Sequence, residues 1–328
     1  MKSRGIVVLA GVILCAVAAR VSIGPVAVGG EIALRLGLPS GDLLALRLDA
    51  SLGALLLGAV LGLSGLALQT LLRNPLASPF VLGVSSGAGF GVASVLAAGY
   101  LLAVPVAHFG GELGGAVVGA LATLLIVSWL GRTREGGDTT TLILSGVIVG
   151  AIFSAGTMLV EQLVPHGLRG DLLSWMAGRL PEIPTRGAFW SLVAAAAIGW
   201  ALLSAKASAL DVACLSDDEA ASSGVDLARL RRMLFIVGGV LAAVAVAYAG
   251  PIGFVGLIGP HIARRMVGAR HALLVTGSAL AGGAVLLGAD VLRQVLDLGT
   301  GRLPVGVVTA LAGGPAFLWL LRRGRWGA

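Results

Sequence analysis

Long apolar segments separated by short polar breaks constrain this chain more than any other feature. A helix of about 20 apolar residues crosses a hydrocarbon layer about 30 Å thick. The sequence contains ten such segments, at about 5–25, 49–71, 79–103, 113–130, 139–163, 187–205, 232–249, 254–268, 272–290 and 304–321. Only 12% of the residues are charged, whereas soluble domains carry about 25%, so an ordinary soluble protein is excluded. The sequence predicts an all-α polytopic membrane protein with about ten transmembrane helices.

The basic residues predict how these helices are oriented. An even number of spans puts both termini on one side, which then holds 15 of the 23 lysines and arginines. Because cytoplasmic loops carry the excess of basic residues, both termini are predicted to be cytoplasmic. This asymmetry depends on the short segment 254–268. Residues 1–19 also look like a signal peptide, but later segments are equally apolar, which favours a first transmembrane helix.

Small residues recur along the predicted helices. Gly58, Gly62 and Gly65 lie three and four positions apart, on one helical face. In lipid, helices associate by close packing of small residues, so this face is predicted to contact another helix. Lining of a substrate path is the alternative.

The segment Asn74-Pro-Leu-Ala-Ser-Pro79 interrupts the apolar pattern. Proline lacks a backbone N–H and biases the preceding residue away from helical dihedrals, so a helix ends here in a tight turn. The small residues from Gly83 to Gly89 allow neighbouring backbones to approach closely. A broken helix at a membrane face is typical of functional segments in transporters.

The longest polar segment, at about 211–232, is predicted to form two short helices. Ser216 and Glu219 have the spacing of a capping box, Gly224 stands where the first helix would end, and Asp226 starts a second helical stretch. Such a segment could dock a partner. By itself it also fits an ordinary solvated loop.

The chain carries no recognisable catalytic or metal-binding constellation. A phosphate-binding loop needs a lysine after its glycines, and the only lysines are Lys2 and Lys206. Cys15 and Cys214 lie far apart, and the four histidines are scattered. A lone histidine near a helix end, such as His271, is expected to be interfacial. Without a catalytic constellation, the chain is predicted to be no enzyme. No acid or histidine is predicted at mid-membrane, as proton-coupled transport would require, so the energy for transport is predicted to come from elsewhere.

Three motifs carry a resemblance to a known family: Asn74–Pro79, Gly250–Arg265 and Leu303–Arg323. Together they closely resemble the FecCD family, the permease subunits of ATP-binding-cassette (ABC) importers for iron chelates, haem and cobalamin. The resemblance implies a BtuC-like permease fold, with residues 1–328 forming a single transmembrane domain. It also implies a second permease copy or a close homologue, two ATPase subunits and an extracytoplasmic binding protein as partners, with no cofactor and no nucleic acid.

The resemblance also implies roles for particular residues. The ATPase would dock on Asp217, Asp218, Glu219, Ala220, Gly224 and Val225, where Asp217 replaces the family's glycine. A cytoplasmic gate would be formed by Asn74, Leu76, Thr139 and Thr140, for which helix capping is the alternative. The binding protein would meet exposed arginines, namely Arg47, Arg293 and Arg302. His261, within the second motif, would be structural.

The function expected from this resemblance is import of a ferric siderophore-type chelate across the bacterial cytoplasmic membrane. Haem and cobalamin are the close alternatives. An ion-coupled secondary transporter and a membrane scaffold without transport activity are the rivals from other classes.

Overall fold

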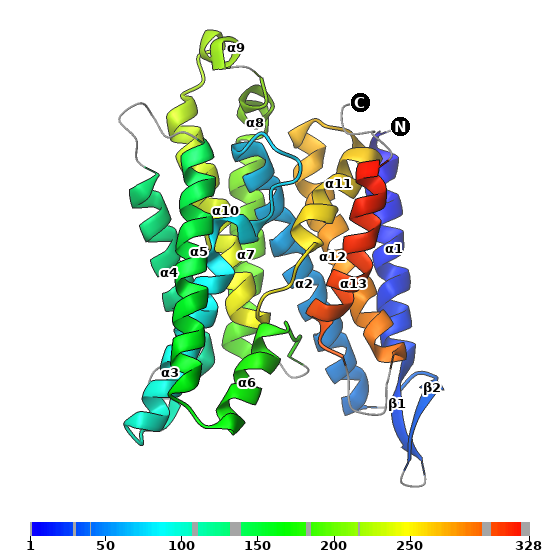
Figure 1. Cartoon of the computed structure of the whole chain (residues 1–328). Coiled ribbons are helices and arrows are strands. Elements are labelled where there is room, and N and C mark those ends of the chain that lie inside the picture. The colour runs from blue at the N-terminus through cyan, green and yellow to red at the C-terminus, as the bar shows by residue number, and fades with distance from the viewer. Residues whose placement is uncertain are drawn as a thin grey trace.

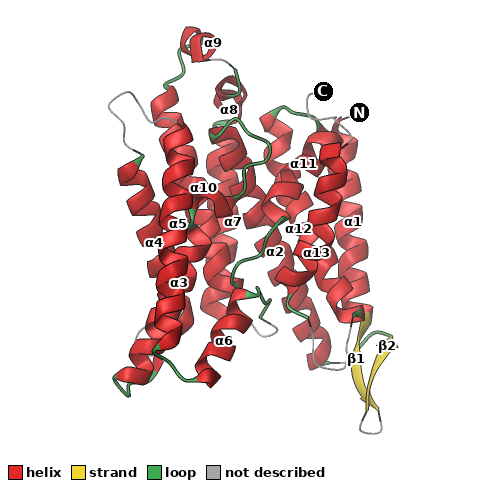
Figure 2. Ribbon diagram, in the orientation of Figure 1, coloured by secondary structure: helices red, strands yellow, loops and turns green. Residues whose placement is uncertain are grey.

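The computed structural model describes residues 2–28, 31–39, 41–106, 111–131, 139–181, 185–215, 217–296 and 303–322. Its helices run side by side in one bundle (Figure 1), and Figure 2 shows that, among these residues, strands are confined to one hairpin. The helices are α1 (Lys2–Ser22), α2 (Asp42–Leu71), η1 (Pro79–Leu82), α3 (Val84–Leu101), α4 (Gly111–Leu130), α5 (Thr139–Gln162), α6 (His166–Met176), α7 (Arg186–Ala205), α8 (Ala207–Ala213), α9 (Asp217–Ser222), α10 (Leu227–Ala249), α11 (Val255–Val267), α12 (His271–Val295) and α13 (Val305–Arg322).

The two ends of the bundle differ. At one end α1 begins, α13 ends and α9 projects, and we call this the terminal end (Figure 1). At the other, the hairpin end, the antiparallel strands β1 (Ile23–Val28) and β2 (Glu31–Leu36) extend beyond the helices.

All ten predicted spans coincide with helices, so the prediction of an all-α polytopic membrane protein is confirmed. Eight helices in the described part of the chain are long and apolar enough to cross a membrane. The shortest predicted span, at about 254–268, corresponds to α11, which has 13 residues. At 1.5 Å per residue it is about 20 Å long and cannot cross the hydrocarbon layer alone.

Three elements were not predicted: the hairpin, α6 and α8. The first span was predicted to continue to residue 25, but α1 ends at Ser22 and β1 pairs Ile23 with Leu36 of β2. Gly24 and Pro25 explain the change, since proline cannot donate the next helical hydrogen bond.

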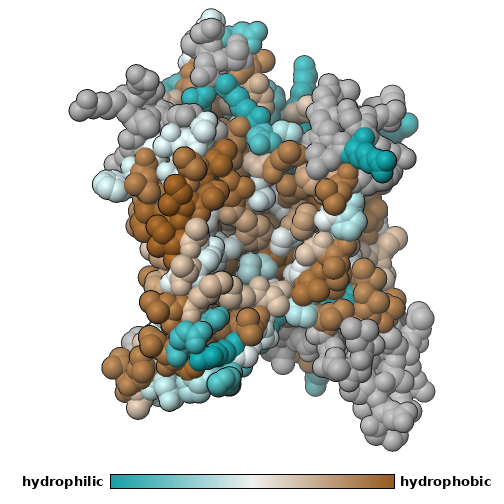
Figure 3. All heavy atoms as spheres, in the orientation of Figure 1, coloured by the Kyte–Doolittle hydropathy of each residue, from teal (hydrophilic) through white to brown (hydrophobic). Residues whose placement is uncertain are grey.

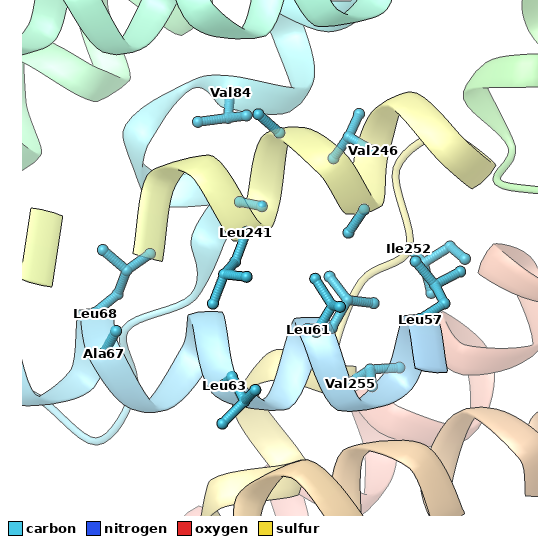
Figure 4. Close-up of a cluster of buried hydrophobic side chains, with 14 of the residues drawn as sticks. Leu57, Leu61, Leu63, Ala67, Leu68, Val84, Leu241, Val246, Ile252 and Val255 are labelled. Carbon is cyan, nitrogen blue, oxygen red and sulfur yellow. The ribbon is translucent and has the colours of Figure 1, made fainter. Parts of the chain in front are cut away.

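Helices α2 and α10 are the most buried of the long helices, and α12 packs against α2. Figure 4 shows Leu61 and Leu68 of α2 and Leu241 of α10 pointing into the space between these two helices. On another face of α2, a Cβ atom at Gly58 would overlap the backbone of Gly282 in α12. The predicted packing role of the small residues in α2 is therefore confirmed.

The outer helices expose apolar side chains. Few residues of α5 and α7 are buried, whereas α2 and α10 are mainly buried. On the face drawn in Figure 3, hydrophobic atoms dominate the middle of the molecule and hydrophilic atoms gather toward its ends. This is the surface expected of a protein surrounded by lipid.

Candidate functional site

The predicted docking segment projects from the terminal end of the bundle (Figure 1). The helix α9 ends at Ser222, and Gly224 follows with φ = 72°, a left-handed conformation that glycine adopts without steric penalty. Asp226 then caps α10, because its Oδ1 accepts a hydrogen bond from the backbone N of Arg229 at 3.0 Å. Two helical stretches joined at a glycine are thus confirmed. Ser216, part of the predicted capping box, lies outside the described residues.

The other predicted docking residues lie on both sides of this turn. Asp217 and Asp218 begin α9, and Glu219 is exposed. Ala220 is buried, and Val225 is half-buried against the core of the bundle. The segment therefore combines an exposed surface with an apolar anchor.

His271, the first residue of α12, joins this segment to the bundle. Its backbone N donates to Asp211 Oδ1 of α8 at 2.9 Å, and its ring Nδ1 lies 2.7 Å from the same oxygen. Its Nε2 lies 3.1 Å from Thr70 Oγ1 of α2, and the residue is only 3% exposed. One imidazole thus links α8, α2 and α12. The histidine lies at a helix end, as expected, but it is buried, and its partners are 60 and 201 residues away, so no local pattern reveals them.

The predicted break after α2 is present. Pro79 opens η1, and Gly83 separates it from α3 with φ = 71°. Asn74 Oδ1 accepts a hydrogen bond from the backbone N of Leu76 at 2.9 Å, which forms an Asx turn and not the helix cap considered as the alternative to gating. The Leu76 side chain is 39% exposed. Asn74 therefore shapes the turn, whatever further role it has.

The predicted gate residues lie on neighbouring elements at the terminal end. Thr139 is the first residue of α5, and Thr140 is exposed. The junction between η1 and α3, which follows this turn, packs against α5, since a Cβ atom on Gly83 would come within 2.7 Å of the Gly146 carbonyl oxygen. A gate between the turn and α5 stays a prediction.

Three arginines lie buried toward the hairpin end, where α1, α2 and α12 meet. Asp290 Oδ2 accepts a hydrogen bond from Arg20 Nε, and its Oδ1 accepts one from Arg293 Nε, both at 2.5 Å. Arg47 Nη1 donates to the Val21 carbonyl oxygen at 2.6 Å. The exposed fractions are 3% for Arg20, 6% for Arg47 and 4% for Arg293. A buried charge is costly unless it is paired, so these bonds are expected to hold the three helices together.

This burial contradicts the predicted exposure of Arg47 and Arg293. The prediction took these positions from the family resemblance, whereas both side chains find acceptors inside the bundle. Docking of a binding protein on either guanidinium would require this interior to open. Arg302 lies outside the described residues.

Two of the sequence motifs meet in space with the chain after α6. The backbone N of Arg179 donates to the Ala249 carbonyl at 2.8 Å, and the backbone N of Gly306 donates to the Gly178 carbonyl at 3.1 Å. Figure 1 shows the chain between α10 and α11 rising through the bundle without helical structure. Irregular backbone at membrane depth must be buried in protein or line a water-filled cavity. Here the chain after α6 is joined to the end of α10 and to the start of α13 by hydrogen bonds between backbone N–H and carbonyl groups. The separate motifs could not predict this contact.

A cysteine lies beside the docking segment. Partial burial raises the pKa of the Cys214 thiol, an effect that Arg264 and Arg73 oppose and Asp211 reinforces. Within the described residues, no group of three or more His, Cys, Asp or Glu side chains could hold a metal ion.

The chain is similar to permease proteins along almost its whole length. The profile of the FecCD transport family matches residues 6–323. The chain is 38% identical over 269 residues to the cobalamin import system permease protein BtuC of Halobacterium salinarum, covering 81% of this chain and 69% of that protein. It is 35% identical to the Fe(3+) dicitrate transport system permease protein FecC of Escherichia coli, covering 87% and 84%. It is also 35% identical to the hemin transport system permease protein HmuU of Yersinia pestis, covering 85% and 83%.

Solved structures share the fold. An inward-facing transporter assigned to the metal-chelate ABC type superposes with a TM-score of 0.84 at 26% identity, covering 98% of this chain and 99% of that chain. PsaBC from Streptococcus pneumoniae, in complex with Fab, has a TM-score of 0.55 at 16% identity, covering 83% and 90%, and shows similarity of fold alone.

Proposed function

Because the chain belongs to the FecCD transport family, we propose that it carries a ferric chelate across the cytoplasmic membrane, driven by ATP that separate subunits hydrolyse. The chain is a multi-pass membrane protein and an ABC importer permease of the metal-chelate, B12 and haem type. It is therefore a translocation subunit and not an enzyme. The observation that carries the proposal is the family match over residues 6–323.

The ATPase would dock on the segment around α9 and Gly224. Three features support this role: the segment projects beyond the bundle, Glu219 of α9 is exposed, and Asp211 bonds its base to His271. A displacement of α8 would move α12 and α2 through the hydrogen bonds of the His271 imidazole. The excess of basic residues on the side of the termini supports a cytoplasmic position for this end.

The gate would close the cytoplasmic end of the path between the turn after α2 and the start of α5. Asn74 and Leu76 would act from the turn, and Thr139 and Thr140 from the helix. The packing of Gly83 against α5 supports this pairing, because η1, which continues the turn, is displaced when α5 moves.

Two permease chains, either identical or closely homologous, would enclose the path at a two-fold axis. The apolar surface of α5, of which little is buried in one chain, is available for such an interface. Two ATPase subunits would bind on the cytoplasmic side, and a substrate-binding protein would deliver cargo at the hairpin end.

The cargo proposed is a ferric siderophore-type chelate, with haem and cobalamin as alternatives. Relatives named for cobalamin, ferric dicitrate and hemin are 38%, 35% and 35% identical to this chain, so similarity alone does not separate the three cargoes. Each is a large chelate, which agrees with a path opened by whole-helix movement.

Reconstitution into liposomes tests the proposal. The chain would be co-purified with its ATPase and supplied with its binding protein and, in separate samples, a radiolabelled ferric siderophore, hemin or cyanocobalamin. We expect uptake of the ferric chelate only when ATP is present on the ATPase side. Uptake by this chain alone without ATP would overturn the transport mechanism, and exclusive uptake of hemin or cyanocobalamin would overturn the cargo assignment.

A further inference from the structure

A cavity of about 780 Å³ opens at the terminal end of the bundle, beside the docking segment. Its walls are the end of α2 and the turn that follows, α8, and the connection between α11 and α12. Asn74 of the proposed gate and Asp211 and Cys214 at the base of the docking segment are among its lining residues, whereas the docking residues from Asp217 to Val225 are not.

Arginines from three different elements converge on this cavity. Arg73 follows α2, Arg264 lies in the last turn of α11, and Arg270 precedes α12. Two of them are held in place: Arg73 Nε donates to the Ala213 carbonyl at 2.8 Å, and Arg264 Nη1 donates to Gln69 Oε1 at 2.7 Å. A guanidinium has five N–H donors in a rigid plane, so one fixed bond orients the others. The cavity therefore presents positioned donors and not only loose surface charge.

The only acid that lines the cavity does not cancel this charge. Asp211 accepts from the backbone N of His271 and lies 2.7 Å from its Nδ1, so its carboxylate is engaged at the start of α12. Three arginines against one engaged carboxylate leave an excess of positive charge. The N-terminus of the 25-residue helix α12 also borders the cavity and adds its positive dipole end.

We propose that this cavity binds a phosphate-bearing anion. Guanidinium groups bind phosphate oxygens in pairs, and helix N-termini favour phosphate for the same electrostatic reason. The volume exceeds what one carboxylate side chain would fill. Basic pockets between transmembrane helices on the cytoplasmic side are suited to anionic phospholipid headgroups. A soluble phosphate compound has the same recognition chemistry.

The test compares two phosphate sources on the purified full-length chain in detergent. In the lipid arm, phosphatidylglycerol and zwitterionic phosphatidylcholine are titrated and bound lipid is counted by native mass spectrometry. In the soluble arm, inorganic pyrophosphate is titrated and the shift in thermal unfolding is followed.

The test variant is Arg73→Gln with Arg270→Gln, which leaves the bond between Arg264 and Gln69 intact. The control is Arg229→Gln with Arg232→Gln, which removes two exposed arginines from the start of α10 at the same end. Both variants lose the same net charge, so a general electrostatic effect would appear in both. Retention of the wild-type unfolding temperature without added anion shows that each variant is folded.

We expect phosphatidylglycerol or pyrophosphate to bind the wild-type chain and the control alike. The test variant should lose about tenfold or more in affinity, since each lost charged hydrogen bond weakens binding by at least this order. Binding in the lipid arm alone identifies a headgroup site, and binding in the soluble arm identifies a soluble ligand.

Two results would overturn the proposal. One is equal anion binding by the test and control variants. The other is failure of both phosphate probes while capture of the partner ATPase depends on Arg73 and Arg270, which would make the cavity a protein contact. The assay needs neither ATP nor cargo, so its failure leaves the proposed transport function standing, and failure of transport leaves this site standing.

Discussion

Replacement of Asp290 by alanine tests whether buried charges hold α1 and α12 together. The carboxylate is 1% exposed and accepts hydrogen bonds at 2.5 Å from Arg20 and from Arg293. Without it, two buried guanidinium groups lose their shared counter-charge. Breaking a buried ion pair costs about 3–5 kcal/mol, so Asp290→Ala is expected to lower the free energy of unfolding by about that amount.

The measurement is reversible unfolding in mixed detergent and dodecyl sulfate micelles, followed by circular dichroism. The matched control is Asp226→Ala, whose partner Arg229 lies 3.6 Å away and is 87% exposed. That variant loses one helix cap and a weak surface pair, and about 1 kcal/mol is expected. A triple variant, Arg20→Met with Asp290→Leu and Arg293→Met, removes all three charges and should recover most of the lost stability.

Equal losses for Asp290→Ala and Asp226→Ala would refute this reasoning, because burial would then make no difference. A triple variant no more stable than Asp290→Ala would refute it as well, since the loss would come from packing and not from unpaired charge.

Three further predictions concern other parts of the molecule. Gly62→Leu should lower the free energy of unfolding by about 1–3 kcal/mol, because the new side chain overlaps the Ser278 carbonyl of α12. Gly288→Leu should be near neutral in the same assay, because a Cβ atom at Gly288 has no atom of another described segment within 4 Å. Gly224→Ile should reduce ATP-dependent uptake several-fold while Gly224→Asn retains it, because φ = 72° strains a β-branched residue more than it strains asparagine. Equal uptake by the two variants would count against docking of the ATPase through this turn. Maleimide labelling of Cys214 should be slow at about pH 7 and accelerate as the pH rises, because the pKa of the thiol is raised and only the thiolate reacts. Arg73→Gln should slow labelling further, because this arginine lowers the pKa of the thiol. A labelling rate independent of Arg73 would place its guanidinium group elsewhere.

Much of the fold could be predicted because the relevant signals are local. The length of each apolar segment follows from the thickness of the membrane, and all ten predicted segments coincide with helices. Pro79 and Gly83 mark the break after α2, and Gly224 marks the turn after α9, because their backbone chemistry leaves few alternatives. The small residues of α2 likewise indicated a contact face, although not its partner.

Only the tertiary structure decided which polar groups are buried. Arg47 and Arg293 look in sequence like exposed charges at span ends, and His271 looks like an interfacial residue. Acceptors from distant segments reach Arg47 and His271, namely the Val21 carbonyl and Asp211. Arg293 pairs with Asp290 three residues earlier in α12, and Arg20 of α1 donates to the same carboxylate. Side-chain burial depends on which helices become neighbours, and that neighbourhood is set by packing across the whole bundle. For the same reason, the sequence revealed the individual backbone breaks and arginines, whereas their convergence into one junction and one basic cavity required the folded chain.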